Sequence, residues 1–204
     1  MRKISKSTAV LATAVGCALG VGVTTASAAG TWTVSGGTSF TGSASSPTLT
    51  DSRSGAKLTC TSSAASGTAA NGTGLSGTGI ASLSSVSWTN CTGPAGITFT
   101  VTPQGLPWAF NAVSYSAPVT TGTLTGVKAH ISGTLCSADF QGATAGSTAT
   151  LNGSYNNTTH QLTISGGNLH AYNVVGCLGL IANNDAATYN GVYTVSPALT
   201  ITSP

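Results

Sequence analysis

The side chains that could do acid–base chemistry form a short inventory in residues 29–204. They are three histidines and three aspartates, without any glutamate: His130, His160, His170, Asp51, Asp139 and Asp185. A serine hydrolase needs a serine, a histidine and a carboxylate that converge in space. His170 with Asp139 or Asp185 could supply the base and its orienting carboxylate, although the sequence lacks a G-x-S-x-G motif. Because these groups are scarce and scattered, we expect a protein that is not an enzyme, with a hydrolase at this site as the alternative.

The same inventory gives little support to a bound metal. The histidines lack a short His-x-x-x-His spacing, and the cysteines stand singly rather than in the close pairs of structural zinc sites. The run Asn183-Asn184-Asp185 offers only one carboxylate, whereas a calcium site needs about six to eight oxygen ligands. Such a run is typical of a turn. The sequence therefore predicts no metal and no cofactor.

Aromatic side chains are the better candidates for contact with a ligand. Planar rings on a sheet offer a large contact area to sugars or apolar molecules. The segment Leu106-Pro107-Trp108-Ala109-Phe110 is the best placed, because proline keeps a chain away from central strands. We expect an exposed platform of Trp108, Phe110 and Tyr115 that binds a carbohydrate or an apolar molecule. The alternative is that these rings fill the core between two sheets.

The charge balance excludes several classes of partner. Three of the six Lys and Arg residues lie in the first six positions, so residues 29–204 have three cations against three aspartates. A nucleic-acid-binding protein must neutralise phosphates with many cations. A polybasic membrane patch requires a similar excess. We therefore expect neither of these partners, and the sequence does not predict an oligomeric state.

Residues 1–28 have the form of a secretory signal peptide. A basic start is followed by a run of small and apolar residues and then by Ala26-Ser27-Ala28, with cleavage predicted after Ala28. The apolar run is short for a membrane span, which needs roughly 20 residues. A third alternative is a lipoprotein cleaved before Cys17. The signal peptide predicts a secreted, extracellular protein.

Four cysteines remain after the predicted cleavage, and an even number in a secreted chain implies two disulfides. Three pairings are open. We favour Cys60–Cys91 and Cys136–Cys177, because each pair then joins neighbours along the sequence within one half of the chain.

Alternation of apolar and polar residues predicts β-strands throughout. In 97–102 the apolar residues take one face and three threonines the other, and 127–135 alternates in the same way. Turn signals recur every 8–12 residues, which favours an all-β antiparallel sandwich or barrel of about 10–12 short strands with two disulfides. Residues 66–79 are rich in Gly, Ala and Ser and are expected to form a long loop or a weak edge strand. We expect one domain over 29–204, with two similar halves meeting near 103–118 as the alternative.

Two segments resemble a known kind of family. They are Ile97–Pro103 followed by Leu106-Pro107-Trp108, and Asn173–Ile181 with its Val174-Val175-Gly176-Cys177. Together with the leader and the single cysteines, they are similar to an uncharacterised family of small secreted all-β proteins of high-GC Gram-positive, actinobacterial-type bacteria. The resemblance implies an exported β-protein, and it implies no function and no site residues.

These observations favour an exported, non-catalytic β-protein that acts by binding or assembly at the cell surface or in the medium. The alternatives are the secreted hydrolase and an oligomeric envelope channel. A channel barrel would need strands of about 9–11 residues with an apolar outer band, and most expected strands are shorter.

Overall fold

The computed structural model describes residues 31–204, so the predicted signal peptide lies outside the described part of the chain. The strands are β1 (Trp32–Ser35), β2 (Ser39–Ser45), β3 (Thr48–Asp51), β4 (Lys57–Ala69), β5 (Gly72–Leu75), β6 (Ala81–Thr92), β7 (Thr98–Gln104), β8 (Trp108–Ser116), β9 (Val119–Gly133), β10 (Cys136–Gln141), β11 (Ala149–Asn156), β12 (Gln161–Ser165), β13 (Leu169–Gly176), β14 (Ala186–Ser196) and β15 (Thr200–Thr202). Two 3-10 turns, η1 (Pro94–Gly96) and η2 (Cys177–Gly179), complete the described elements. No helix in residues 31–204 is long and apolar enough to cross a membrane.

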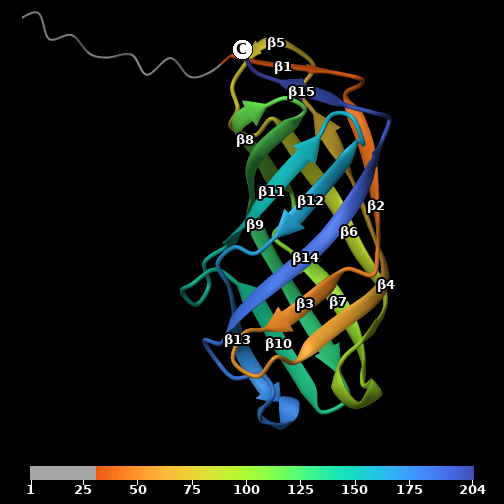
Figure 1. Ribbon diagram of the computed structural model, residues 1–204. Coiled ribbons are helices and arrows are strands. Elements are labelled where there is room, and N and C mark those ends of the chain that lie inside the picture. Colours follow the sequence, from red (N-terminus) through yellow and green to blue (C-terminus); the bar gives the residue numbers. More distant parts are fainter. Residues whose placement is uncertain (1–30) are drawn as a thin grey trace, which may run out of the picture.

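The strands close into an antiparallel barrel (Figure 1). Around its upper part the order is β2, β4, β6, β8, β9, β11, β12 and β14, and β14 pairs with β2 to complete the ring. Around its lower part the order is β3, β4, β6, β7, β9, β10, β13 and β14, and β14 pairs with β3. The long strands β4, β6, β9 and β14 run through both rings, while shorter strands share the spaces between them. The expectation of an all-β antiparallel fold is confirmed.

The strand lengths differ from those expected. There are fifteen strands in the described residues, and the four that serve both rings are 11 to 15 residues long. The segment 66–79 is not one long loop, because β4 continues to Ala69 in the middle of the sheet. Close packing of neighbouring strands explains why the residues of this segment are small. A Cβ on Gly67 would collide with the carbonyl oxygen of Ser82 on β6, so only glycine allows the two strands to approach here.

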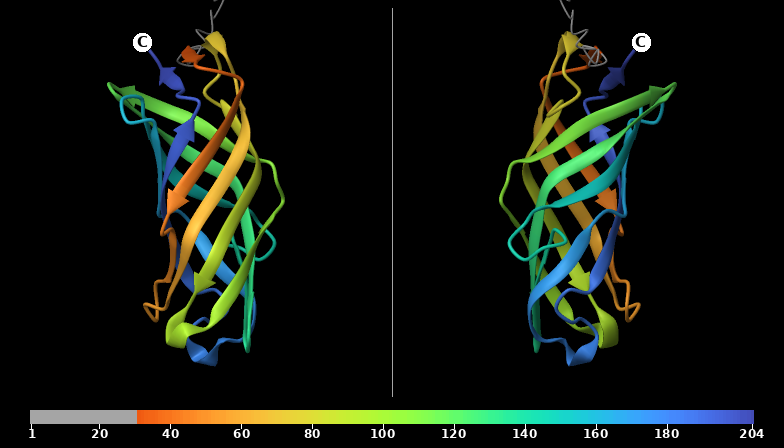
Figure 2. Two further views of the ribbon diagram at one scale, coloured as in Figure 1. Left: turned by 90° about the vertical axis from the view of Figure 1, so that its right-hand side faces the viewer. Right: turned by 90° about the vertical axis from the view of Figure 1, so that its left-hand side faces the viewer.

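A small sheet covers the upper end of the barrel. Its order is β15, β1 and β5 (Figures 1 and 2). Trp32 and Val34 of β1 and Ile201 of β15 are buried beneath it. Hydrogen bonds hold this cap to the barrel wall, since the Tyr155 hydroxyl donates to Leu199 O at 2.8 Å and the Thr120 hydroxyl donates to Ile201 O at 2.6 Å. The upper end is therefore closed.

Both expected disulfides are confirmed. Cys60–Cys91 joins directly paired positions of β4 and β6 in the lower ring. Cys136–Cys177 joins the start of β10 to η2 at the lower tip of the molecule. Each bridge therefore strengthens the lower end, which has no covering sheet.

Side chains alternate across much of the barrel wall, with interruptions at β-bulges in β4–β6, β8–β9, β9–β11 and β10–β13. In β2 every second residue is buried, and inward positions of the other strands carry Leu, Val, Ile, Phe and Ala. Outward positions carry mainly Ser, Thr and Gly. Most of the described strands are shorter than the roughly 9–11 residues of a channel strand, as expected, although β4, β6, β8, β9 and β14 reach that length. The apolar lining of the barrel interior also argues against a water-filled path through it.

Candidate functional site

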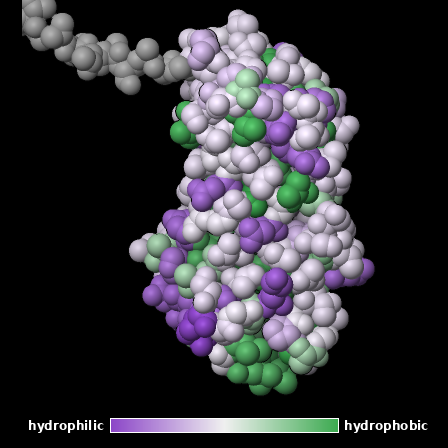
Figure 3. Space-filling view, viewed as in Figure 1, coloured by the Kyte–Doolittle hydropathy of each residue, from purple (hydrophilic) through white to green (hydrophobic). Residues whose placement is uncertain are grey.

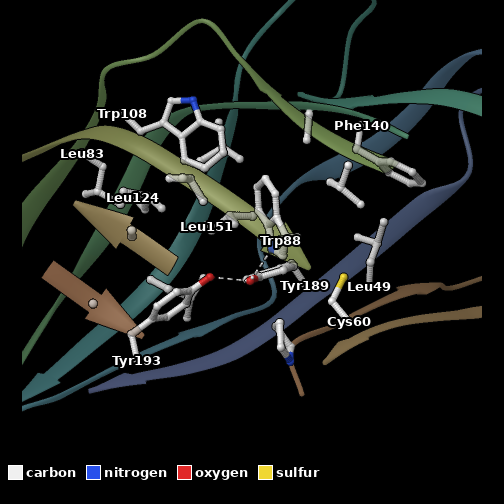
Figure 4. Close-up of a pocket in the computed structure, with 18 of the residues that line it drawn as sticks. Leu49, Cys60, Leu83, Trp88, Trp108, Leu124, Phe140, Leu151, Tyr189 and Tyr193 are labelled. Carbon is white, nitrogen blue, oxygen red and sulfur yellow. Dashed lines mark hydrogen bonds between the residues drawn. The ribbon is translucent and has the colours of Figure 1, made fainter. Parts of the chain in front are cut away.

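An apolar cavity with a volume of about 80 Å³ lies inside the barrel (Figure 4). Its wall comes from almost every strand of the barrel, and its lining includes Phe40, Leu49, Leu58, Ala65, Leu83, Val86, Trp88, Val101, Trp108, Leu124, Val127, Ile131, Phe140, Leu151, Tyr189 and Tyr193. A buried water needs on the order of 10–15 Å³, so the space suits about five to eight groups the size of a water or a methylene. No charged residue belongs to the lining.

Aromatic rings divide this interior. Trp88 of β6 lies at its centre in Figure 4, with its ring centroid 6.3 Å from that of Trp108 and 6.4 Å from that of Tyr189. The Trp88 and Tyr189 rings meet edge to face, which is a favourable arrangement for aromatic pairs. Trp108 is itself held in place, because its Nε1–H donates to Gln104 O at 3.0 Å. The rings therefore form a fixed wall rather than mobile side chains.

A chain of hydrogen bonds satisfies the polar atoms of this wall. Trp88 Nε1–H donates to the Tyr189 hydroxyl at 3.1 Å, and the two tyrosine hydroxyls lie 2.6 Å apart. The Tyr193 hydroxyl donates to Ser63 Oγ at 2.9 Å, and Ser63 donates to Ser87 O at 2.8 Å. Because the chain ends on a carbonyl, each donor has one acceptor when Tyr189 donates to Tyr193. Every donor of the chain is used internally.

The two tyrosines stay neutral in this environment. Burial raises the pKa of Tyr189 well above its ordinary value, and the neighbouring Tyr193 raises it further. Burial also raises the pKa of Tyr193, against smaller opposing effects of its hydrogen bonds to Ser63 and Tyr189. The cavity wall is therefore uncharged over the physiological range of pH.

A smaller space of about 30 Å³ lies below the cavity. It shares Leu49, Leu58, Ile131 and Phe140 with the main cavity. Its remaining lining comes from the lower ends of β3, β4 and β7 and from the turns and loops beside them: Asp51, Ala56, Lys57, Gly93, Pro94, Phe99 and Ile181. We name it the lower vestibule. Its position makes the lower end the short route into the barrel, since the small sheet covers the upper end.

The groups proposed for a hydrolase are not brought together. His170 Nδ1 contacts Asn168 O at 3.1 Å rather than a carboxylate. Asp185 binds Arg53 through both carboxylate oxygens, with a closest N–O distance of 2.8 Å. Hydrogen bonding to Arg53 lowers the pKa of Asp185. The arrangement is a structural ion pair that ties the β3–β4 turn to the loop before β14.

Asp139 has a different partner from the one expected. His130 Nδ1 lies 2.6 Å from Asp139 Oδ1, because the two residues are directly paired across β9 and β10. Asn173 donates to the other carboxylate oxygen at 2.7 Å. Burial would raise the pKa of Asp139, but the hydrogen bonds from Asn173 and His130 outweigh it, and the pKa is lowered. Among residues 31–204, no three His, Cys, Asp or Glu residues are grouped to hold a metal.

The aromatic candidates lie inside the wall rather than on an exposed platform. Trp108 and Phe110 are each 3% exposed, and Tyr115 is half-buried. The expectation that Pro107 keeps this segment away from central strands is wrong, because Pro107 directly precedes β8, which is paired on both sides in the upper ring, so its inward residues are covered. Trp108 lines the cavity and remains a candidate for ligand contact from the inside.

Sequence reasoning missed most of the cavity lining. Trp88, Tyr189 and Tyr193 are inward residues of β6 and β14, and their alternation marks them only as core. The spacing of Tyr189 and Tyr193 by four residues, with Gly191 between them, was the available signal, because it leaves room between two rings on one face.

Comparison with known proteins identifies the family of this chain. No curated protein and no solved structure matches this chain. The model of the family described as "Alkane oxidation protein activator PraA/PraB-like" matches residues 1–203. The chain therefore belongs to the PraA/PraB-like family.

Proposed function

We propose that this protein binds a neutral apolar molecule of the alkane class inside its barrel and acts by binding, not by catalysis. The observation that carries the proposal is the uncharged cavity of about 80 Å³ inside the barrel. Apolar cavities of this kind stay dry and accept small apolar molecules. The family description, which names an activator of alkane oxidation, supports the same class of ligand.

The chemistry of the wall favours hydrocarbons over their charged oxidation products. A fatty carboxylate entering the cavity would leave its charge without a cation, because the lining has no Lys or Arg. The hydrogen-bonded tyrosines have no free donor to offer such an oxygen. A protein of this kind would hold an alkane for an enzyme elsewhere, since Asp185 is paired with Arg53 and Asp139 with His130 outside the cavity.

Export is part of the proposal. The predicted signal peptide and the two disulfides are consistent with a protein that works outside the cell, because disulfides persist in oxidising compartments. The actinobacterial-type origin implied by the resemblance remains a prediction.

A brominated alkane tests cavity binding directly, because bromine quenches tryptophan fluorescence on contact. We expect 1-bromohexane to quench the protein in a saturable way, since Trp88 and Trp108 line the cavity. Unlabelled n-hexane should compete, and hexanoate should not. Absence of saturable quenching would refute the proposal.

A variant that fills the cavity tests the position of the ligand, and the same substitution on the outer surface is its control. Ala65 of β4 lines the cavity, whereas Ala186 of β14 is exposed. Ala65→Leu adds three carbon atoms to the interior and should weaken binding about 50-fold, from about 0.8 kcal/mol for each methylene displaced. Ala186→Leu makes the same chemical change on the outside and should leave binding unchanged. Equal effects of the two variants would place the ligand elsewhere.

A further inference from the structure

Three large apolar side chains gather on the lower tip of the barrel. Leu135, Val175 and Leu178 are 73%, 68% and 72% exposed. The β9–β10 turn carries Leu135, and the end of β13 and η2 carry the other two. Figure 3 shows this apolar tip as a hydrophobic cluster at the bottom of a surface that is mostly polar. We define the apolar tip by these three residues.

The tip is held rigidly. Cys136–Cys177 joins its two loops, and Cys177 N–H donates to Leu135 O at 2.8 Å. At its base, Arg53 Nη2 donates to Gly179 O at 3.0 Å and the Ser54 hydroxyl donates to Leu180 O at 2.6 Å. The exposed side chains are therefore presented on a fixed support.

The backbone of the tip is unfavourable for leucine. Leu135 and Leu178 have φ values of +61° and +52°, in the left-handed region where glycine and asparagine are more stable. A leucine here is disfavoured by its backbone and again by its exposure to water. Such strain is concentrated at functional positions. The two leucines therefore indicate a requirement for apolar side chains at this end.

We propose that the apolar tip inserts into the surface of a liquid hydrocarbon. Three side chains on a narrow convex tip are too few for a protein partner, because a stable interface buries about 800 Å² on each side. A fluid phase needs no complementary shape. The inference goes beyond binding inside the barrel and does not depend on it.

The charges near the tip favour hydrocarbon over a phospholipid membrane. Anionic lipid surfaces attract proteins through clusters of Lys and Arg. The tip itself has no charged residue, and Arg53 at its base is paired with Asp185. A hydrocarbon surface has no headgroup charge to match and no polar layer to cross, so it fits a short uncharged tip.

The tip lies beside the route into the cavity. Ile181 lines the lower vestibule and follows Leu178 by three residues in the same loop. Insertion of the tip would therefore bring the vestibule to the hydrocarbon surface.

Adsorption to n-hexadecane droplets tests the tip, with the protein left in the aqueous phase as the readout. Leu135→Asn combined with Leu178→Asn should weaken adsorption about a hundredfold, at about tenfold for each apolar side chain kept out of the hydrocarbon. Asparagine adopts the left-handed φ readily, so the fold should be retained. Adsorption unchanged in this double variant would overturn the proposal.

A second pair of variants controls for exposed valines in general. Val175 on the tip and Val113 on β8 are both 68% exposed. Val175→Thr should weaken adsorption severalfold, whereas Val113→Thr should not change it. Equal losses would overturn the assignment to the tip.

Two further measurements separate the remaining explanations. Binding to phospholipid vesicles as tight as binding to droplets would overturn the choice of hydrocarbon. Quenching by 1-bromohexane in solution should be the same in the tip variants as in the unaltered protein, so loss of adsorption with intact quenching supports a separate surface. Loss of both would overturn the separate role of the tip.

Discussion

The hydrogen-bonded chain inside the barrel can be tested through the energetic coupling of its two tyrosines. In Tyr193→Phe, the Tyr189 hydroxyl loses its acceptor. In Tyr189→Phe, the Trp88 Nε1–H loses its acceptor. Each single variant thus leaves one donor unpaired against an apolar wall. The double variant removes both hydroxyls and leaves only the Trp88 N–H unpaired.

The magnitude follows from this count of unpaired donors. An unpaired buried donor costs about 1–3 kcal/mol. The two single variants together contain two such donors, and the double variant contains one. The double variant should therefore lose less stability than the sum of the single variants, by about 1–3 kcal/mol.

Urea denaturation of the disulfide-bonded protein measures the four free energies of unfolding in this cycle, with a common m-value as the sign of unchanged two-state unfolding. Tyr172→Phe is the control. Its hydroxyl lies on the surface, away from the chain, 2.8 Å from both Ala143 O and Asn184 Oδ1, and donates its one hydrogen to either acceptor. It should therefore add independently to either inner variant. Additivity of the Tyr189 and Tyr193 variants within about 0.3–0.5 kcal/mol would refute the chain.

Three other changes have outcomes that thermal or chemical denaturation can measure. Gly67→Ala should destabilise the protein by about 1–3 kcal/mol or prevent folding, because its Cβ meets a strand carbonyl, whereas Gly42→Ala, with its nearest atom at 3.6 Å, should be tolerated. Removing the Cys136–Cys177 disulfide, which closes a loop with a sequence separation of 41, should lower the free energy of unfolding by about 4 kcal/mol, because the unfolded chain gains conformational entropy. A decrease below about 1 kcal/mol would contradict this argument. Asp139 has a pKa below its ordinary 3.8, so its carboxylate stabilises the folded protein above that pH, and this contribution is lost as the pH falls through the folded pKa. Asp139→Asn should therefore reduce the fall in the free energy of unfolding at acid pH. An unchanged fall would contradict the role of Asp139.

The strands were predictable where their two faces differ in chemistry. Polar residues alternate with apolar ones in 97–102, where they are threonines, and in 127–135, and this alternation identifies β7 and β9, because a half-buried strand must alternate. Residues 66–69 have small side chains on both faces, so alternation is not visible there. They belong to a strand because neighbouring backbones approach closely at Gly67, and a tertiary contact of this kind leaves no periodic signal.

The candidate site was harder to predict, because it depends on closure of the barrel. Trp88 and Tyr189 are 101 residues apart and meet only when β14 pairs with β2 and β3. His130 and Asp139 illustrate the same limit at short range. Their pairing follows from the register of the β9–β10 hairpin, which the sequence does not specify uniquely. The disulfides were predictable because four single cysteines leave few pairings.

The polar chain gives the cavity a particular selectivity. A completely aliphatic interior of this volume would accept any apolar group and could collapse onto the space. Here Trp88 and the two tyrosines are fixed by hydrogen bonds across β4, β6 and β14, so the rings keep the cavity open. Their donors are all used, and what they present to a ligand is ring surface and oxygen lone pairs. Such a wall repels carboxylates, tolerates a single hydroxyl donor and costs a hydrocarbon nothing in lost hydrogen bonds. Under the proposed function, the polar groups of this site would act by excluding charged molecules, and an alkane would gain its affinity from burial alone.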